Sequence, residues 1–266
     1  MTPASPTTAL ATDLRERAAD LALRAGAMIR QARRSGAGLV DTKLVDTKST
    51  ATDMVTEFDR ASERLIVDAI RAARPDDAIV GEEGTADEGT SGVSWLIDPI
   101  DGTTNFLYGL PGYAVSIAAA DHDGALAGAV YVPATDELFT AARGQGATLN
   151  GEPIHCSDNT DIATALVATG FSYHPDLRQK HMRRLQHIIA DIRDIRRFGA
   201  AAPDLCYVAA GRVDAYFEEH LGPWVSRPAS SSPVRRGASP VTSPAARFAR
   251  PRCWSPTRRS SSPCGR

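Results

Sequence analysis

The fold of this chain is decided at Trp95-Leu96-Ile97-Asp98-Pro99-Ile100-Asp101-Gly102-Thr103-Thr104-Asn105-Phe106, where an apolar run leads into a turn with two carboxylates. Pro99 has no N–H to donate, so we expect the strand to end there. Gly102 lets the backbone bend close to a ligand, and residues 103–105 add hydroxyl, amide and N–H donors suited to an anion. The same residue types build ordinary turns, but in this context they predict a site for Mg²⁺ and phosphate.

Further oxygen ligands lie outward from this stretch. Glu82 follows the apolar run 78–80, just as Asp98 follows an apolar run of its own. If the two runs are neighbouring strands, Glu82, Asp98 and Asp101 meet at one edge of the sheet. Ile100 adds its backbone carbonyl as a further hard ligand. Taken alone, the acidic pair that begins with Glu82 is equally typical of a solvated loop, so this interpretation depends on the longer stretch.

Hydrolysis of a phosphate monoester also needs an oriented water molecule, because the uncatalysed reaction is among the slowest known. Two or more Mg²⁺ ions would neutralise charge and lower the pKa of that water. Thr103 is placed to accept its proton, with Asp59 on the polar face of a predicted helix as the orienting partner. By itself, the segment around Asp59 is also typical of an ordinary helix start.

The apolar periodicity predicts helices and antiparallel strands in separate blocks, which indicates an α+β layered fold. We expect helices over about 12–33 (with Thr12 or Asp13 as N-cap), 55–73, 175–191 and 200–210. Strands are expected over 78–80, 95–98, 113–120, 127–132, 138–142 and 213–217, with a hairpin turn at Asn150-Gly151.

Charge is distributed unevenly along the 266 residues. The net charge is −2, but residues 225–266 hold nine of the 30 basic and none of the 32 acidic residues, so residues 1–224 carry −11. An acidic body argues against a nucleic-acid partner and fits a site for divalent cations. The tail 225–266 also contains ten Ser and seven Pro, so we expect it to be disordered. An Arg-rich arm for nucleic acid is the alternative interpretation of this tail.

The remaining features of the chain predict a cytoplasmic protein without a membrane partner. The four cysteines have no metal-binding spacing, and no segment has the pattern of a signal peptide or membrane span. We divide the chain into a flexible N-terminus (1–11), one domain (12–224) and the tail (225–266). The domain is expected to have an N-terminal lobe over about 12–150 and an incomplete C-terminal lobe over about 151–224.

Four motifs make the chain resemble the inositol monophosphatase family of Mg²⁺-dependent, lithium-sensitive phosphomonoesterases. They are Asp53-Met54-Val55-Thr56-Glu57-Phe58-Asp59, Gly81-Glu82-Glu83, the stretch from Trp95 to Phe106, and Gly211-Arg212-Val213-Asp214-Ala215-Tyr216-Phe217-Glu218. The resemblance covers about residues 12–224. It implies a layered α-β-α-β-α sandwich, a homodimer, a small phosphorylated metabolite as substrate, Mg²⁺ as cofactor and Li⁺ as inhibitor.

The resemblance also implies roles for individual residues. The metal ligands would be Glu82, Asp98, the carbonyl of Ile100 and Asp101. Thr103 and Asp59 would activate the water together with Glu82. The substrate contacts would be Ile100, Asp101, the backbone N–H groups of Gly102 and Thr103, and Arg196, Gly199, Ala200, Ala201 and Glu218.

Two positions depart from the family pattern. Ala200 stands where Ser or Thr is common, so one hydroxyl near the substrate is missing. After Glu218 the pattern ends in Trp-Asp, and this aspartate is a metal ligand, whereas the chain has Trp224-Val225. Because a valine side chain cannot coordinate Mg²⁺, we expect weak metal binding and turnover slower by orders of magnitude. The missing part of the second lobe would also leave apolar surface exposed and lower the solubility.

The tail is consistent with a shifted reading frame. When the codons from Val225 to Gly237 are read from the third base of the valine codon, the permitted codons spell LAAGELIAREAG. Continuing through Ser243 permits GVASDF, and together these match the family's helix and following strand in order and length. We therefore expect a frameshift, in the gene or in its sequencing, at or just after the Trp224 codon.

The sequence thus predicts hydrolysis of a small polyol monophosphate by metal-activated water, with inositol 1-phosphate as the first substrate to test. Histidinol phosphate, fructose 1,6-bisphosphate and adenosine 3′,5′-bisphosphate are alternatives within the family. A relative that keeps the fold and binds ligands without turnover is the alternative of a different class, and Val225 favours it.

Overall fold

The computed structural model describes residues 6–35, 45–47 and 54–219. The predicted disordered tail, and Val225 with it, lies outside the described residues.

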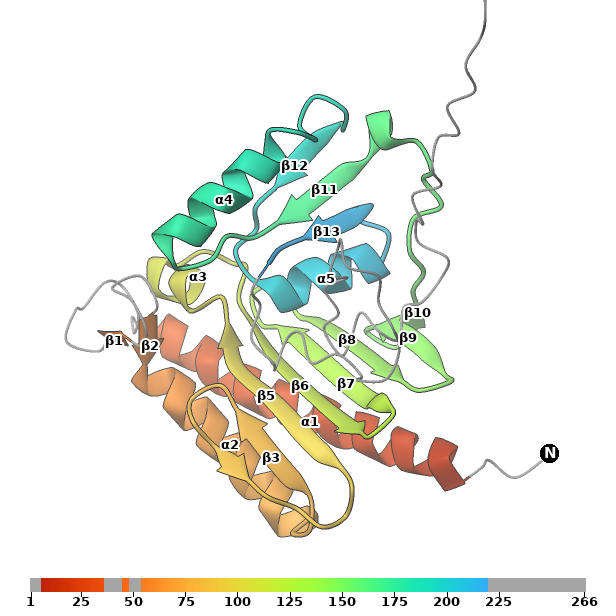
Figure 1. Ribbon diagram of the computed structural model, residues 1–266. Coiled ribbons are helices and arrows are strands. Elements are labelled where there is room, and N and C mark those ends of the chain that lie inside the picture. The colour runs from red at the N-terminus through yellow and green to blue at the C-terminus, as the bar shows by residue number, and fades with distance from the viewer. Residues whose placement is uncertain (1–5, 36–44, 48–53, 220–266) are drawn as a thin grey trace, which may run out of the picture.

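The largest layer is an eight-stranded sheet (Figure 1). Its strands are β3 (Ala78–Gly81), β4 (Ala86–Asp87), β5 (Ser94–Asp101), β6 (Ala114–Asp121), β7 (Gly124–Val132), β8 (Glu137–Ala142), β9 (Gly146–Leu149) and β10 (Glu152–Pro153). They lie in the order β10-β9-β8-β7-β6-β5-β3-β4, and all neighbours are antiparallel except β3 and β5. The predicted hairpin turn is confirmed, since Asn150 (φ 50°) and Gly151 (φ 89°) both adopt the left-handed conformation that it requires.

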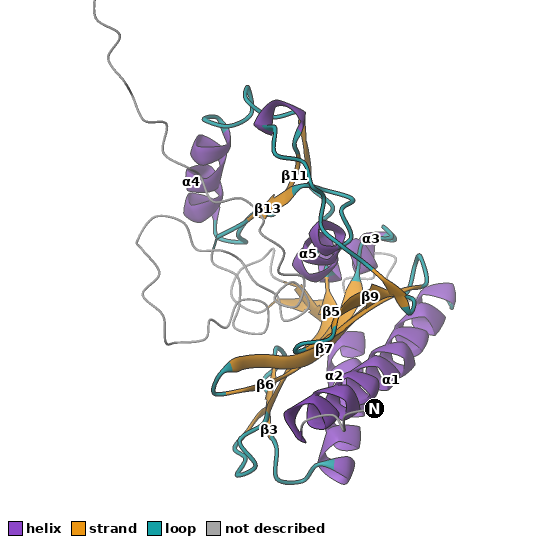
Figure 2. Ribbon diagram, turned by 90° about the vertical axis from the view of Figure 1, so that its right-hand side faces the viewer, coloured by secondary structure: helices purple, strands orange, loops and turns teal. Residues whose placement is uncertain are grey.

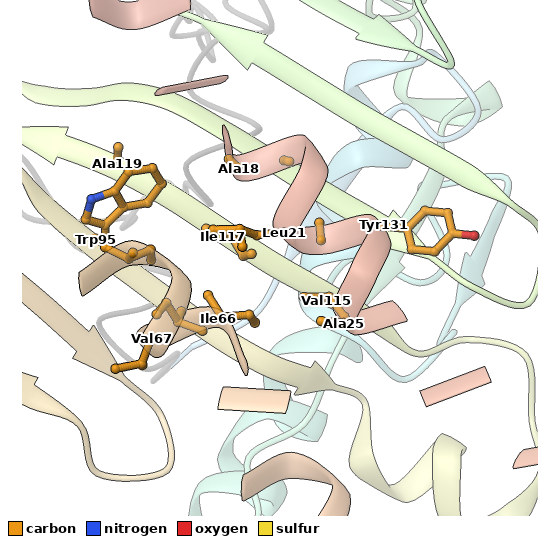
Figure 3. Packing of buried hydrophobic residues seen from close by; sticks show 14 of the residues in the cluster. Ala18, Leu21, Ala25, Ile66, Val67, Trp95, Val115, Ile117, Ala119 and Tyr131 are labelled. Atoms are coloured by element: carbon orange, nitrogen blue, oxygen red, sulfur yellow. The ribbon is translucent and has the colours of Figure 1, made fainter. Parts of the chain in front are cut away.

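Two long helices, α1 (Pro6–Arg34) and α2 (Glu57–Ala73), lie side by side on one face of this sheet (Figure 2). Their apolar sides form the main core with the facing sheet residues, as Figure 3 shows for Leu21 of α1, Ile66 of α2 and Ile117 of β6. Strands β6 and β7 are rich in alanine, and the lack of a side chain at Gly26 lets α1 approach the ring of Tyr131 closely. Short side chains on both elements therefore bring helix and sheet together.

The opposite face of the large sheet is covered by helix α5 (Ala201–Ala209). Ala202 and Cys206 of this helix form a second, smaller core with Val130 and Phe139 of the sheet. These sheet residues alternate along their strands with the residues that face α1 and α2, as the period of two in a β-strand requires.

A second sheet consists of three parallel strands, β11 (Leu166–Thr169), β12 (Asp194–Arg196) and β13 (Ala215–Phe217), in the order β12-β11-β13. Helix α5 lies on one face of this sheet and α4 (Pro175–Leu185) on the other (Figure 2). The layers follow the predicted α-β-α-β-α order. The short elements are β1 (Val45–Thr47), β2 (Met54–Thr56), α3 (Thr103–Tyr108) and a 3₁₀ turn (Ile162–Thr164).

Several predicted boundaries were wrong. Helix α1 begins at Pro6, so residues 6–11 are helical instead of part of a flexible N-terminus. Thr12 is not an N-cap, because its hydroxyl donates to the carbonyl of Thr8 (3.0 Å) one turn back in the same helix. Helix α4 ends at Leu185 instead of residue 191. The first sheet extends to Pro153, close to the lobe boundary expected at about residue 150.

Candidate metal and phosphate site

Pro99 does not end its strand, contrary to the prediction. Strand β5 continues to Asp101, and its pairing with β6 becomes irregular instead. Asp98 pairs with Ser116 and Asp101 pairs with Ala114, so three steps along β5 correspond to two steps along β6. This is a β-bulge, the one arrangement inside a sheet that accommodates a residue without an N–H.

The bulge decides where the two carboxylates lie. Residues three apart in a regular strand point to opposite faces, whereas one inserted residue returns Asp98 and Asp101 to the same face. The carboxylate of Asp101 accepts the N–H of Ala202 on α5 (2.5 Å), while Ile97 and Ile100 lie in the core beneath α1 and α2. Both carboxylates are therefore on the α5 side of the large sheet.

Glu82 lies next to this pair, as the sequence predicted on condition that the two apolar runs are neighbours. Strand β3 runs parallel to β5, with Gly81 opposite Ile97, and the N–H of Glu82 donates to the carbonyl of Ile97 (3.0 Å). Because the two strands are parallel and Gly81 lies opposite Ile97, the residues that follow these two, Glu82 and Asp98, lie beside each other.

Thr103 and Asp59 are in direct contact. The hydroxyl of Thr103 donates to Oδ1 of Asp59 (3.1 Å) and to the carbonyl of Ile100 (3.0 Å). The other oxygen of Asp59 accepts the N–H (2.8 Å) and the hydroxyl (2.5 Å) of Thr56, the N-cap of α2. Asp59 thus completes the capping box of α2 and contacts Thr103 at the same time.

The site concentrates negative charge in a buried place. Burial, with a smaller contribution from the charge of Glu82, raises the pKa of Asp59 to about 6, although its hydrogen bonds to Thr56 and Thr103 oppose this shift. Burial also raises the pKa of Asp101, which lies near Glu82 and Glu218, although the N–H of Ala202 opposes this shift. The carboxylates repel one another, and a divalent cation would relieve this repulsion. Carboxylate oxygens and a backbone carbonyl oxygen are also the hard ligands that such a cation prefers.

The turn expected to contact the substrate lies against Gly102. This glycine has a φ of 87°, and a Cβ there would be 2.7 Å from the carbonyl oxygen of Gly112 and 2.9 Å from the Cβ of Ala200. The amide of Asn105 fixes the same region, because it donates to the carbonyls of Gly112 (2.5 Å) and Phe198 (2.8 Å). The structure therefore brings the Gly102 turn and the predicted 199–201 segment together.

Arg196 is exposed, and its hydrogen-bond partners lie on its own strand, not among the proposed metal ligands. Its guanidinium pairs with Asp194 (2.5 Å) and donates to the carbonyl of Ile195 (2.8 Å). Arg197 instead reaches the space beside Gly199, 2.7 Å from where a Cβ of that residue would lie. Its positive charge lowers the pKa of Glu218, which burial raises. The sequence analysis missed Arg197. Successive side chains near a strand alternate in direction, so the pair at 196–197 indicated that only one of the two arginines would face the site.

Two further acids lie on α5 or close to it. Glu218 accepts a hydrogen bond from the hydroxyl of Tyr216 and lies directly over Gly170, where a side chain would collide with it. Asp204, which sequence reasoning missed, is 1 % exposed, and burial together with nearby Asp101 raises its pKa to about 8. Its Oδ1 atom has no hydrogen-bond partner among the described residues.

A different acidic set lies in the turn between β6 and β7. The side-chain oxygen and nitrogen atoms of Asp121, His122 and Asp123 lie within 4.8 Å of one another, and no other set of three such residues in the described ranges converges this closely. His122 and Asp123 are exposed, and Asp121 is already bound by both terminal nitrogens of Arg143 (2.9 and 2.8 Å). This set is a surface turn remote from the bulge in β5.

Comparison with known proteins agrees with the fold. The sequence pattern of the inositol monophosphatase family matches residues 11–224. The inositol-1-monophosphatase SuhB of Mycobacterium tuberculosis is 41% identical over 224 residues, which cover 79% of this chain and 77% of the relative. The Nus factor SuhB of Pasteurella multocida is 44% identical over 183 residues, covering 68% of each protein. The crystal structure of the extragenic suppressor protein SuhB from Bartonella henselae superposes with a TM-score of 0.72 at 36% identity, covering 80% of each chain.

Fold and site together define a phosphoric monoester hydrolase. Helices of the described residues are all too short or too polar to cross a membrane. The chain belongs to the inositol monophosphatase family.

Proposed function

We propose that this protein is a Mg²⁺-dependent phosphatase of small polyol monophosphates, with inositol 1-phosphate as its substrate. The observation that carries the proposal is the bulge at Pro99, which turns Asp98 and Asp101 to one face of the sheet beside Glu82. These carboxylates and the carbonyl of Ile100 would hold the cation. When bound, it would supply Lewis-acid activation of water and neutralise the charge of the phosphate.

The chain's own residues then orient the water and receive its proton. Thr103 donates its hydroxyl hydrogen to Asp59, so a lone pair of Thr103 is available for the water molecule. As the water oxygen forms a bond to phosphorus and the ester P–O bond breaks, the water proton moves to Thr103 Oγ1 and the Thr103 proton to Asp59. A pKa of about 6 suits Asp59 to accept it near neutral pH. The leaving alkoxide takes its proton from solvent.

The part of the substrate that carries hydroxyl groups would lie beside the Gly102 turn, toward the start of α5 and Glu218. The backbone N–H groups of Gly102 and Thr103 would hold the phosphate, and the 199–201 segment lies against this turn. Glu218, with Tyr216 and Arg197 beside it, would accept a substrate hydroxyl. The family resemblance supports the same placement. Histidinol phosphate, fructose 1,6-bisphosphate and adenosine 3′,5′-bisphosphate are the competing substrates within the family.

We further propose that turnover of this chain is impaired because Val225 replaces the aspartate of the family pattern. The ligands of one cation, Glu82, Asp98 and the carbonyl of Ile100, are all present, whereas a second cation on Asp98 and Asp101 would lack its further carboxylate. The match to the family ends at residue 224, which is where the proposed frameshift would fall. The second candidate is a binding protein without turnover. The name of one relative, Nus factor SuhB, refers to a role other than hydrolysis and is the observation that favours this candidate.

A comparison of two chains tests these proposals. One is the chain as given, and the other carries aspartate after Trp224 followed by the frame-restored sequence. Both are assayed with Mg²⁺ on inositol 1-phosphate and the three competing substrates, with and without Li⁺. We expect the restored chain to be faster by a factor of at least about 100 and to be inhibited by Li⁺. Full turnover by the chain as given would contradict the role of position 225, and no turnover by either chain would favour the binding protein. Nucleotide sequence around codon 224 decides whether the frame is truly shifted.

The quaternary structure and location remain part of this proposal. Tyr108 (57% exposed) and Leu110 (52% exposed), at the end of α3, are apolar side chains suited to a homodimer contact. Sedimentation of the restored chain would test this, and a monomer at micromolar concentration would contradict it. We also propose a cytoplasmic location, and the free, buried thiol of Cys206 is compatible with it.

A further inference from the structure

Helix α2 presents three buried polar side chains to the site. Asp59, Ser62 and Glu63 are spaced i, i+3 and i+4, so they lie on one face of the helix. Each is at most 4 % exposed. Buried polar groups are costly unless they form hydrogen bonds, and each of these three binds a different segment of the site.

The three bonding partners cover the segments that carry the proposed metal and water chemistry. Asp59 binds Thr103, as described above, and the hydroxyl of Ser62 donates to the carbonyl of Pro99 at the bulge (3.1 Å). Glu63 binds the turn that follows Glu82. One face of one helix therefore connects all the segments of the site that come from the large sheet.

The contacts of Glu63 are the most extensive of the three. One carboxylate oxygen accepts the N–H of Glu83 (2.8 Å), and the other accepts the N–H (3.2 Å) and the hydroxyl (2.6 Å) of Thr85. The same turn is closed by the N–H of Gly81, which donates to the carbonyl of Thr85 (2.8 Å). Three donors on a short turn thus converge on a single buried carboxylate.

The residue before Glu82 is adapted to this carboxylate. A Cβ at Gly81 would collide with all three terminal atoms of the Glu63 side chain. Gly81 therefore allows the carboxylate to reach the turn beyond it. The chain is held on both sides of the Glu82 side chain, because the N–H of Glu82 donates to the carbonyl of Ile97 on β5 and the N–H of the next residue, Glu83, donates to Glu63 on α2.

We propose that Glu63 is a positioning residue that fixes Glu82 relative to the Asp98–Asp101 pair and so sets the affinity of the site for Mg²⁺. This inference rests on the proposed function, since it takes Glu82 as a metal ligand. It concerns the cation whose ligands are all present in the chain, so Val225 does not affect it.

The test compares the parent chain with Glu63→Gln, which keeps the shape of the side chain but replaces one acceptor oxygen by an NH₂ group that faces an N–H donor. Asp68→Asn on the exposed face of the same helix is the matched control. Mg²⁺ affinity is measured by calorimetric titration, and amide hydrogen exchange of residues 82–86 is measured without metal. We expect Glu63→Gln to weaken Mg²⁺ binding by about 10- to 100-fold and to speed exchange in this segment, while Asp68→Asn changes neither.

Thr85→Val is a milder variant that removes only one of the three donors, and it carries the test if Glu63→Gln does not fold. It should show the same two changes in smaller degree. A merely structural role would lower the melting temperature of Glu63→Gln and leave Mg²⁺ affinity and local exchange of the folded protein as in the parent, and that result would overturn the proposal. If the parent binds no Mg²⁺, the metal ligation in the proposed function fails, whereas unchanged exchange at 82–86 would still refute the positioning role by itself.

Discussion

The two sheets of this molecule differ in how thoroughly they are buried. The eight-stranded sheet has α1 and α2 on one face and α5 on the other, and side chains such as Trp95, Ile97 and Ile117 are completely inaccessible to solvent. Within the residues that the structure describes, the outer face of the three-stranded sheet is thinly covered, since only His181 and Leu185 of α4 are buried. The large sheet thus provides a rigid base, whereas the small one depends on few contacts.

This difference corresponds to a division of labour in the proposed site. The proposed metal ligands all lie in a strand of the large sheet or directly after one. The proposed contacts to the hydroxyl-bearing part of the substrate come from the small sheet, from α5 and from residues next to them. Metal binding needs positions fixed to a fraction of an ångström, and it is built on the well-packed part. The part that would distinguish substrates rests on the thinner core, where small changes can be tolerated.

The largest effect we predict comes from deleting core side chains in each lobe. Ile97→Ala should lower the free energy of unfolding by about 4 kcal/mol, because the cavity opens in a core that cannot collapse around it. Leu185→Ala should cost about 2 kcal/mol, the lower end of the range, since the surrounding layer is thin and can relax. Urea unfolding followed by circular dichroism measures both values. Equal losses in the two variants would show that the lobes are equally well packed.

An intermediate effect is predicted for Asp204, on the helix between the sheets. Its pKa is raised to about 8 by burial, so the unfolded chain releases this proton at lower pH than the folded chain. The folded state therefore loses stability as the pH rises from about 4 to about 8. Because Asp204→Asn cannot ionise, its free energy of unfolding should rise by about 2 kcal/mol relative to that of the parent as the pH increases through this range. Thermal unfolding at pH 5 and pH 8 would reveal the gain, and a difference that does not depend on pH would show that Asp204 is ionised in the fold.

The smallest effect is predicted for the exposed turn between β6 and β7. Asp123→Ser should change the free energy of unfolding by less than about 0.5 kcal/mol, because the residue is exposed. Mg²⁺ affinity should also remain that of the parent, whereas Asp98→Asn should abolish measurable binding. The same calorimetric titration compares the two variants. Loss of Mg²⁺ binding in Asp123→Ser would contradict a metal site at the edge of the large sheet and would indicate one in this surface turn.

Local patterns in the sequence were sufficient to predict the fold class and the neighbours of the site. Two apolar runs that each end in an acidic residue correctly placed Glu82 beside Asp98. The prediction that the strand ends at Pro99 was wrong. A β-bulge accommodates this proline within the strand, and the bulge is evident only from the pairing of β5 with β6. Periodicity also missed the strands at 166–169 and 194–196, which are short and lie in a parallel sheet.

The residues that the sequence could not assign are those whose role depends on distant partners. Glu63 is bonded to residues 20 and 22 positions away, and nothing in the sequence of α2 distinguishes it from an exposed glutamate. Arg197 and Asp204 meet their neighbours only through the packing of α5 against the large sheet. Long-range packing, which no periodicity encodes, decides these roles.

The capping box of α2 has a consequence for how this protein can evolve. Asp59 holds the first turn of the helix with one oxygen and Thr103 with the other. Any replacement at this position is therefore selected for helix stability and for the reaction together, and a lineage that abandons hydrolysis still retains a reason to keep the aspartate. An intact Asp59–Thr103 pair is consequently a poor record of whether a member of this family is still an enzyme.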